Sequence, residues 1–390
     1  MSKTPPASKA SLDWIERLVG FDTTSRLSNL ELIDCIADYL AQHGVASDKI
    51  FDATGKKANL YATIGPKDVG GIVLSGHTDV VPVDGQPWTS DPFAMIERDG
   101  RFYGRGTSDM KAFIACAVAA APLFAEPGRL SRPIHFAWSY DEEVGCTGAP
   151  AMIDELVRLL PQPAAVIVGE PTSMKVVGGH KGVALYRVTI RGHEAHSSLT
   201  HLGVSANMVA ARLIAKLVEV EQDLIAGAAK DSPFEPAWST LTIGQISGGT
   251  AANILARDCA FLFDLRCTPD LDPDEVLAGF FEDVRALDAE VRGRFPDCSV
   301  AIERVARVPA FAPEPGGSAE AFARTLSGDN GPLRVVPYGS EAGQFQEVGL
   351  PTVIVGPGSI EQAHQPDEFI DIDQVDACVR FMVRLAEALA

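Results

Sequence analysis

The sequence predicts an α/β protein whose main sheet is covered by helices on both faces, with a ferredoxin-like α+β domain inserted into it. Strand-like apolar segments alternate with helical segments over roughly residues 60–168, as in α/β sheets. Residues 180–308 instead have the order β-α-β-β-α-β, which describes a two-layer ferredoxin-like unit. After Pro309 the α/β character returns.

The first part of the chain opens with helices and continues with alternating strands and helices. Apolar residues at helical spacing predict the helices, and short apolar runs bounded by turn residues predict the strands. In order, these are helices over Ser11–Gly20 and Leu30–His43, strands over Leu60–Ile64 and Gly71–Gly76, a helix from Met110, a strand over Ile134–Ser139, a helix over Met152–Leu160 and a strand over Ala165–Val168.

The middle of the chain contains the elements of the inserted domain. In order, these are a strand over Val183–Arg191, a helix over Val204–Gln222, strands over Ser239–Ile246 and Cys259–Cys267, a helix over Pro273–Arg292 and a strand over Ser299–Val305. A strand over Thr352–Val355 and a helix over Val375–Leu389 then resume the first pattern. The simplest organisation is a discontinuous domain of residues 1–179 and 309–390 that carries an inserted domain of residues 180–308.

Composition argues against several classes of protein. The 390 residues include 52 acidic and 33 basic side chains, a formal net charge of −19, whereas nucleic-acid-binding proteins present basic faces. The longest apolar run, Ala112–Ala125, contains Pro122 and is shorter than the ~20 residues of a membrane helix. Met1–Ala10 lacks the apolar core of a secretion signal, and seven cysteines without a CxxC pair fit reduced thiols. We therefore expect a cytoplasmic protein that binds neither nucleic acid nor membranes.

Residues with metal-ligating side chains follow several of the predicted strands. They are His77 and Asp79, Asp109, Glu142 and Glu143, Glu170 and, near the C-terminus, His364. Since ligands bind at the carboxyl ends of strands in α/β sheets, these oxygens and imidazoles are expected to hold two divalent metal ions. His77 and Asp79 share one face of a strand, so Asp79 can accept the second N–H of the imidazole and fix its tautomer.

Each of these residues has an ordinary explanation when it is taken alone. An aspartate before an apolar helix, such as Asp109, is commonly an N-cap. Adjacent carboxylates such as Glu142 and Glu143 are commonly a solvated pair, and a loop histidine such as His364 commonly lies on the surface. The coincidence of these residues at strand ends is what favours a metal site.

The motifs around these residues match a known family. They are His77-Thr78-Asp79, Gly106 to Lys111, Asp141 to Gly145 and Gly169 to Thr172, in this order. The chain resembles the co-catalytic dinuclear zinc hydrolases, which include acetylornithine deacetylase, succinyl-diaminopimelate desuccinylase, aminoacylase and several carboxypeptidases and dipeptidases. This resemblance implies a zinc-exopeptidase-like catalytic domain, a mixed sheet flanked by helices, and an inserted dimerisation or lid domain.

The resemblance also implies a role for each residue of the site. It implies His77 and Glu170 as ligands of one Zn²⁺, Glu143 and His364 as ligands of a second Zn²⁺, Asp109 as the bridge between them, Glu142 as the general base and Asp79 behind His77. Co²⁺ or Mn²⁺ can replace zinc in such oxygen-rich sites.

Three residues of the inserted domain acquire roles from the same resemblance. His196 matches an oxyanion-stabilising histidine that reaches the site from a partner subunit, which implies a homodimer through the inserted domain. Arg266 and Asn253 resemble positions that bind the carboxylate of the substrate. Two ordinary explanations stay open, because His196 could be a polar loop histidine and Arg266 could pair with an acid on the sheet.

Within the family, the segment from Tyr338 to Glu368 looks like the acetylornithine deacetylase branch, with small departures at Ser340 and Val355. The branch implies hydrolysis of the amide bond of an N-acyl amino acid, in the first place N²-acetyl-L-ornithine in arginine biosynthesis. A desuccinylase, aminoacylase or dipeptidase of the same family is the alternative. A non-catalytic metal- or peptide-binding relative is the alternative of another class, although Glu142 and the ligand positions are intact. A serine hydrolase is disfavoured because no GxSxG motif occurs.

Overall fold

The computed structural model describes residues 6–390, and the chain divides into two compact units. The first unit comprises the chain up to Gly179 together with Pro313–Arg334 and Ser340–Ala390. The second unit comprises His180–Ala312 and Val335–Gly339. Each unit has a hydrophobic core of its own.

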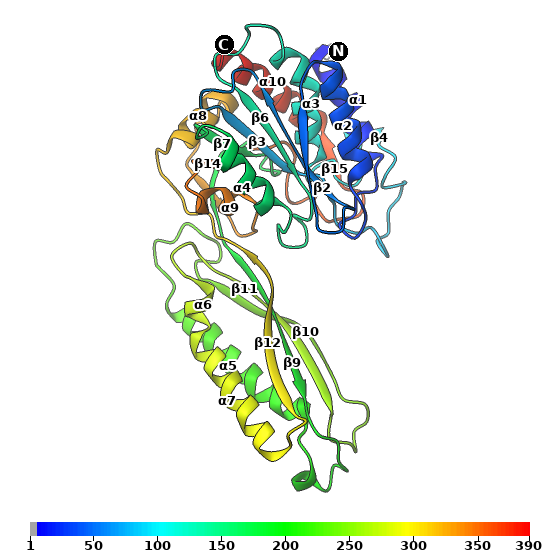
Figure 1. Ribbon diagram of the computed structural model, residues 1–390, viewed down its shortest axis with the longest axis vertical. Helices are drawn as coiled ribbons and strands as arrows, with labels where there is room; N and C mark the ends of the chain where they lie inside the picture. The colour runs from blue at the N-terminus through cyan, green and yellow to red at the C-terminus, as the bar shows by residue number, and fades with distance from the viewer. Residues whose placement is uncertain (1–5) are drawn as a thin grey trace. The chain divides into compact units, whose positions relative to one another are not determined.

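A mixed sheet of eight strands forms the centre of the first unit (Figure 1). In spatial order its strands are β1 (Ser47–Phe51), β2 (Ala58–Ile64), β6 (Ile134–Ser139), β3 (Ile72–His77), β7 (Ala165–Val168), β14 (Thr352–Ile354), β8 (Val177–His180) and β13 (Arg334–Val336). The four neighbours β6, β3, β7 and β14 are parallel, and all their residues are buried. Burial on both faces explains why these strands are almost continuously apolar.

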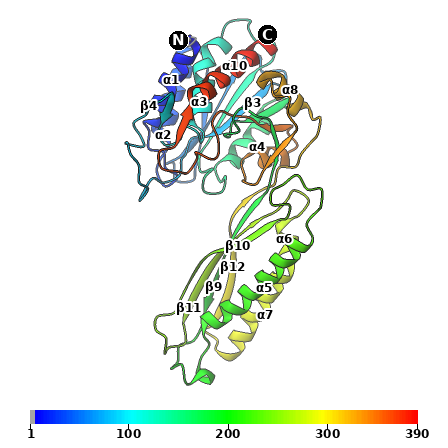
Figure 2. The same cartoon turned by 180° about the vertical axis from the view of Figure 1, so that it is seen from behind.

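Helices cover both faces of this sheet (Figures 1 and 2). The helices that contribute to the main core on one face are α1 (Pro6–Val19), α2 (Leu30–Gln42), α3 (Lys111–Phe124), α8 (Ser318–Ser327) and α10 (Ile372–Ala388). Two further helices, α4 (Ala149–Leu159) and α9 (Ala342–Glu347), contact each other and lie on the other face. Helix α3 is apolar on almost all sides, as expected for a helix buried between others.

A small three-stranded sheet completes the first unit. Its order is β15 (Phe369–Asp371), β5 (Arg101–Tyr103) and β4 (Ile96–Arg98). Across the described residues of the chain, every helix is too short or too polar to cross a bilayer.

The second unit has a four-stranded antiparallel sheet, and its two long helices lie side by side against that sheet (Figure 2). The strand order is β10 (Thr240–Gly248), β11 (Asp258–Arg266), β9 (Val183–Arg191) and β12 (Ser299–Val308). The helices are α5 (Ala206–Ala226), a short α6 (Pro273–Val276) and α7 (Ala278–Arg294), and a 3₁₀ turn, η1, covers Thr200–Leu202. In chain order the strands stand 2-3-1-4, which is the ferredoxin-like arrangement. The predicted fold class, an α/β sheet with an inserted ferredoxin-like unit, is confirmed.

The predicted helix over Pro273–Arg292 is in fact two helices, α6 and α7. The N-cap Asp272 accepts the backbone N–H groups of Asp274 and Glu275 and starts α6. Leu277, whose side chain is fully buried in the core, then ends α6 and precedes α7. The break between the two helices places Leu277 in the core. The helical spacing of apolar residues in the sequence does not reveal this break.

Candidate metal centre

The parallel strands place their carboxyl ends along one edge of the main sheet. His77 is the last residue of β3, and Glu170 lies two residues beyond β7. The residue that follows β7 must be a glycine, because a Cβ atom at Gly169 would lie 2.1 Å from the ring of Phe113 in α3. The fold therefore delivers polar side chains from distant segments to a single edge, as expected for α/β sheets.

His77, Asp109 and Glu170 form one group of possible ligands. Their ligand atoms all lie within 4.8 Å of one another. The Nε2 atom of His77 is 3.0 Å from Oδ1 of Asp109 and 3.8 Å from Oε1 of Glu170. All three residues are buried.

Asp109, Glu143 and His364 form a second group within the same 4.8 Å limit. The Nε2 atom of His364 is 3.4 Å from Oδ2 of Asp109 and 3.0 Å from Oε2 of Glu143. The two oxygens of Asp109 thus face different groups, Oδ1 toward His77 and Oδ2 toward His364. The structure therefore brings together all five side chains predicted as metal ligands, which are His77, Asp109, Glu143, Glu170 and His364.

The electrostatics of the two groups reflect an excess of buried negative charge. Burial and the charges of Asp109 and Glu142 raise the pKa of Glu170 well above its ordinary value. Burial, with the charge of Asp109, raises the pKa of Glu143 to about 7. Hydrogen bonds to Asp109 and Glu143 raise the pKa of His364 to about 10. Burial lowers the pKa of His77, but its hydrogen bonds with Asp109 and Asp79 outweigh this and raise that pKa well above 6.5.

The donor set fits divalent cations. Within residues 6–390, the Oε1 atom of Glu170 is buried and has no hydrogen-bond partner, and an unpartnered buried carboxylate oxygen is costly. Carboxylates and imidazoles at these separations are the ligands that zinc and similar metal ions take. A positive ion between these oxygens would remove both the repulsion and the unsatisfied acceptor.

Asp79 uses its atoms differently from the sequence-based expectation. The Nδ1 atom of His77 is 2.9 Å from the backbone oxygen of Asp79 and 3.5 Å from its carboxylate. The carboxylate accepts hydrogen bonds from the backbone N–H groups of Glu142, at 3.1 Å, and Glu143, at 3.3 Å. It also accepts the hydroxyl of Ser25 at 2.7 Å. Asp79 therefore holds the loop of the two glutamates as well as the imidazole ring.

Glu142 and Glu143 face different neighbours, as adjacent residues in a loop should. Glu143 lies against His364, whereas Oε1 of Glu142 accepts a hydrogen bond from the thiol of Cys146 at 3.3 Å. Burial raises the pKa of Glu142 well above its ordinary value. Glu142 therefore holds a proton more readily than an exposed glutamate does, although it belongs to neither group of possible ligands.

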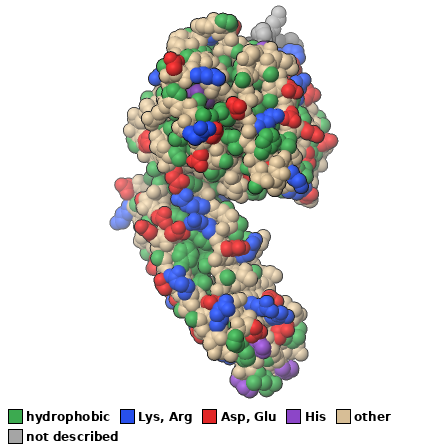
Figure 3. All heavy atoms as spheres, in the orientation of Figure 1, with side chains coloured by type: hydrophobic (Ala, Val, Ile, Leu, Met, Phe, Trp, Pro, Cys, Tyr) green, Lys and Arg blue, Asp and Glu red, His purple; other side chains and the backbone are tan. Residues whose placement is uncertain are grey.

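The nominated residues of the second unit lie at two ends of its sheet. His196 and Asn253 lie in neighbouring loops, where the N–H of Ser197 donates to the backbone oxygen of Asn253 at 3.0 Å. Histidine side chains gather on the surface at that end of the unit (Figure 3). Arg266 ends β11 at the other end of the sheet and pairs with Asp264 at 2.8 Å. Within one chain the structure does not bring Arg266 and Asn253 together.

Several residues at the centre carried no recognised role in the sequence. Glu341 is buried and accepts hydrogen bonds from the hydroxyls of Ser75, at 3.0 Å, and Ser139, so it joins β3 and β6 behind His77. Arg105 and Glu368 form a fully buried ion pair of 2.7 Å beside Asp109. Their partners lie hundreds of residues away in the chain, and only the fold reveals the contacts.

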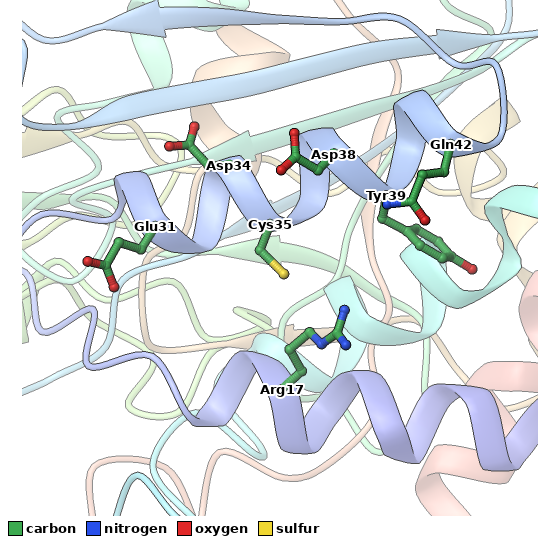
Figure 4. A pocket seen from close by; sticks show the side chains of 7 residues that line it. All are labelled: Arg17, Glu31, Asp34, Cys35, Asp38, Tyr39 and Gln42. Atoms are coloured by element: carbon green, nitrogen blue, oxygen red, sulfur yellow. The ribbon is translucent and has the colours of Figure 1, made fainter.

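A surface pocket between α1 and α2 lies outside this centre (Figure 4). Its lining residues are Arg17, Glu31, Asp34, Cys35, Asp38, Tyr39 and Gln42. None of them belongs to the two groups described above.

A mixed α/β sheet that brings carboxylate and imidazole groups together at its carboxyl edge suits a metal-dependent hydrolase. The sequence profile of peptidase family M20/M25/M40 matches residues 73–388. Acetylornithine deacetylase of Myxococcus xanthus is 34% identical over 98% of this chain and 98% of that protein. The chain belongs to peptidase family M20/M25/M40 and is a hydrolase of that family, as the sequence predicted.

Solved structures share the fold. A family M20 metallo-carboxypeptidase from Sulfolobus solfataricus has a TM-score of 0.78 at 18% identity, covering 97% of this chain and 98% of that chain. The YXEP protein of Bacillus subtilis, titled a dinuclear metal binding peptidase from the M20 family, has a TM-score of 0.65 at 16% identity, covering 98% of both chains.

Proposed function

We propose that this chain hydrolyses the amide bond of N²-acetyl-L-ornithine to L-ornithine and acetate, using two divalent metal ions. The observation that carries metal-dependent hydrolysis is the carboxylate of Asp109, whose two oxygens face two ligand groups, one of which contains the unpartnered oxygen of Glu170. The choice of substrate rests on full-length similarity to the acetylornithine deacetylase of Myxococcus xanthus.

In this proposal the five clustered side chains hold the ions. His77 and Glu170 would hold one ion, Glu143 and His364 would hold the other, and the carboxylate of Asp109 would contribute to both. Zinc is the proposed native metal, and Co²⁺ or Mn²⁺ are possible substitutes because all three ions accept nitrogen and oxygen ligands. When bound, such ions polarise the amide carbonyl and lower the pKa of water.

Glu142 is the proposed general base. Its carboxylate takes a proton from the attacking water and passes it to the nitrogen of the departing amine. Glu142 suits this role because its carboxylate belongs to neither group of possible ligands and lies in the same loop as Glu143, which belongs to one of them. The bonds from the N–H groups of Glu142 and Glu143 to Asp79 keep the loop in place.

The second unit supports a proposal of a homodimer through residues 180–308. β11 runs from Asp258 to Arg266, about 26 Å at ~3.3 Å per residue, so one small substrate cannot touch both ends of it. If Arg266 and Asn253 both bind the substrate carboxylate, and His196 stabilises the oxyanion, two copies of the chain must contribute.

Exposed apolar groups support the same interface. β10 is an edge strand of the sheet, and edge strands offer unpaired backbone groups to another chain. Its Ile246 is 60% exposed, and Met208 of α5 is 69% exposed. A second copy of this chain is the proposed partner.

Metal removal and substrate choice test the function together. Chelated protein should be inactive and should recover on addition of Zn²⁺, Co²⁺ or Mn²⁺. The value of kcat/KM should be highest for acetylornithine in a panel of acetylated, succinylated and dipeptide substrates. A higher value for a succinylated substrate or a dipeptide would favour the alternative activities within the family.

Substitution of the general base separates binding from turnover. The Glu142→Gln variant should keep two metal ions by elemental analysis and lose about 10²–10⁴-fold in kcat. Glu361→Gln, an exposed glutamate in the His364 loop, is the matched control. A near wild-type rate in Glu142→Gln at full metal content would contradict the role. Mixed dimers of His196→Ala and Glu142→Ala chains should recover part of the activity if His196 acts across the dimer.

A further inference from the structure

Two possible ligands of the second group, His364 and Asp109, lie on loops from distant parts of the chain, and their separation depends on contacts between these loops. His364 is in a loop, has a φ of 62° and has a side chain that is 51% exposed. Asp109 lies in the loop that precedes α3. Together with Glu143 they form the second group, so the geometry of that group depends on how the two loops are held.

The carboxylate of Glu368 holds the loop of Asp109. It accepts the backbone N–H groups of Gly106 at 3.1 Å, Ser108 at 2.8 Å and Asp109 at 3.0 Å. Its backbone oxygen accepts the N–H of Gly104 at 2.9 Å. The loop therefore wraps around one fully buried side chain, and the position of Asp109 follows that of Glu368.

Arg105 and Gln86 continue this chain of contacts to the His364 loop. Nη1 of Arg105 donates to Glu368 at 2.7 Å, and Nη2 donates to Oε1 of Gln86 at 2.6 Å. The other end of the Gln86 amide, Nε2, donates to the backbone oxygen of His364 at 2.9 Å. The indole N–H of Trp88 also donates to Oε1 of Gln86 at 2.9 Å, which fixes the orientation of the amide.

We propose that Gln86 is a positioning residue: through Arg105 and Glu368 it fixes His364 relative to Asp109, and so sets the metal affinity of the second group alone. This inference rests on the proposed function, in which that group holds a metal ion. The two ends of the Gln86 amide join the buried Arg105 to the backbone of His364, and Nη1 of Arg105 also donates to the backbone oxygen of Gln365 at 3.4 Å. Residues that orient metal ligands typically change affinity 10- to 100-fold when they are replaced.

Two substitutions of Gln86 separate its acceptor from its donor. Gln86→Glu keeps an oxygen for Arg105 and Trp88 but cannot donate to His364, and its added negative charge by itself favours cations. Gln86→Met is neutral and loses both contacts. Thr89→Val is the matched control, because it removes a hydroxyl contact with Asp367 between the same two segments and leaves the Gln86 contacts intact.

Titration of each metal-free protein with Zn²⁺, followed by calorimetry, measures the two binding events without any assay of activity. We expect wild type and Thr89→Val to show two events, and both Gln86 variants to show one unchanged event and one weakened about tenfold or more. The Co²⁺ absorption spectrum should change for one site only, and it should be the same site in Gln86→Glu, which keeps the acceptor for Arg105, as in Gln86→Met.

The outcomes distinguish this inference from the function on which it rests. Two events of wild-type affinity in both Gln86 variants would overturn the positioning role, and so would equal weakening of both events. Failure of the wild-type protein to bind two ions would instead overturn the proposed metal centre itself.

Discussion

The burial of His135 predicts a loss of stability on acidification that one substitution removes. His135 lies in β6, its Nδ1 is 3.0 Å from the hydroxyl of Thr63, and its buried Nε2 has no partner in the described part of the chain. Burial lowers the pKa of His135 from 6.5 to about 4. As the pH falls below 6.5, His135 becomes protonated in the unfolded chain, whereas in the folded chain it stays neutral until about pH 4. Stability is therefore unaffected above 6.5, falls between 6.5 and 4, and is lower by about 3 kcal/mol below 4.

The His135→Leu variant should lack this loss. Urea unfolding of the metal-free wild type and variant at pH 7.5 and pH 5 measures the contribution of His135 alone. The contributions of all other titrating groups cancel in the difference between the two proteins. The variant should gain about 2 kcal/mol relative to wild type between these two pH values. Gln42→Leu, at an exposed position of the same unit that carries no titrating group, is the control and should show no such gain. A wild-type minus variant difference that is the same at both pH values would refute the reasoning.

Three further outcomes follow from burial and exposure elsewhere. Arg105→Met should lower the free energy of unfolding in urea by about 3–5 kcal/mol, because it leaves Glu368 buried without its cation. Arg101→Met removes one partner of an exposed pair and should change this free energy little. Equal effects of the two substitutions would contradict the prediction. Ile246→Lys should convert the proposed dimer to a monomer by light scattering, and an unchanged mass would exclude β10 from the interface. Chelation should lower Tm, with recovery that grows with the concentration of added Zn²⁺, since ligands of the folded state stabilise by mass action; a Tm indifferent to zinc would argue against the centre.

The elements that the sequence predicts best are those whose burial pattern is simple. Ala165–Val168 is wholly apolar, Ile134–Ser139 is apolar apart from His135 and Ser139, and both occur as strands with the predicted bounds. Val183–Arg191 alternates between buried and more exposed residues because helices cover one face of its sheet, and its bounds are also confirmed. In each case the local pattern and the tertiary burial agree.

Three edge strands are not evident in the sequence, unlike the longer edge strands β10 and β12, which it predicts. β1, Ser47–Phe51, contains Asp48 and Lys49, since an edge strand faces water and needs no continuous apolar run. β13 and β15 have three residues each, too few to show any period. Their pairing depends on contacts supplied by distant segments, so no local rule finds them.

The same contrast applies to the candidate centre. Most of the nominated ligands follow strands that are evident in the sequence, and the rule that ligands bind at strand ends is enough to predict that these side chains meet at one edge of the sheet. Glu368 obeys no such rule, because its bonds to Ser108 and Asp109 span about 260 residues of the chain. Spacing carries no information about contacts of that length.

Asp79 illustrates why residue types are predicted more readily than the atoms that act. The spacing of His77 and Asp79 correctly makes them neighbours, yet the imidazole lies closer to the backbone oxygen than to the carboxylate. That leaves the carboxylate oxygens available to accept the N–H groups of Glu142 and Glu143. The loop of these two residues begins at Asp141, whose φ is 57°, a conformation that non-glycine residues adopt only when neighbouring contacts hold them. A single aspartate therefore ties the imidazole of one ligand group to the loop that carries both the proposed base and a ligand of the other group.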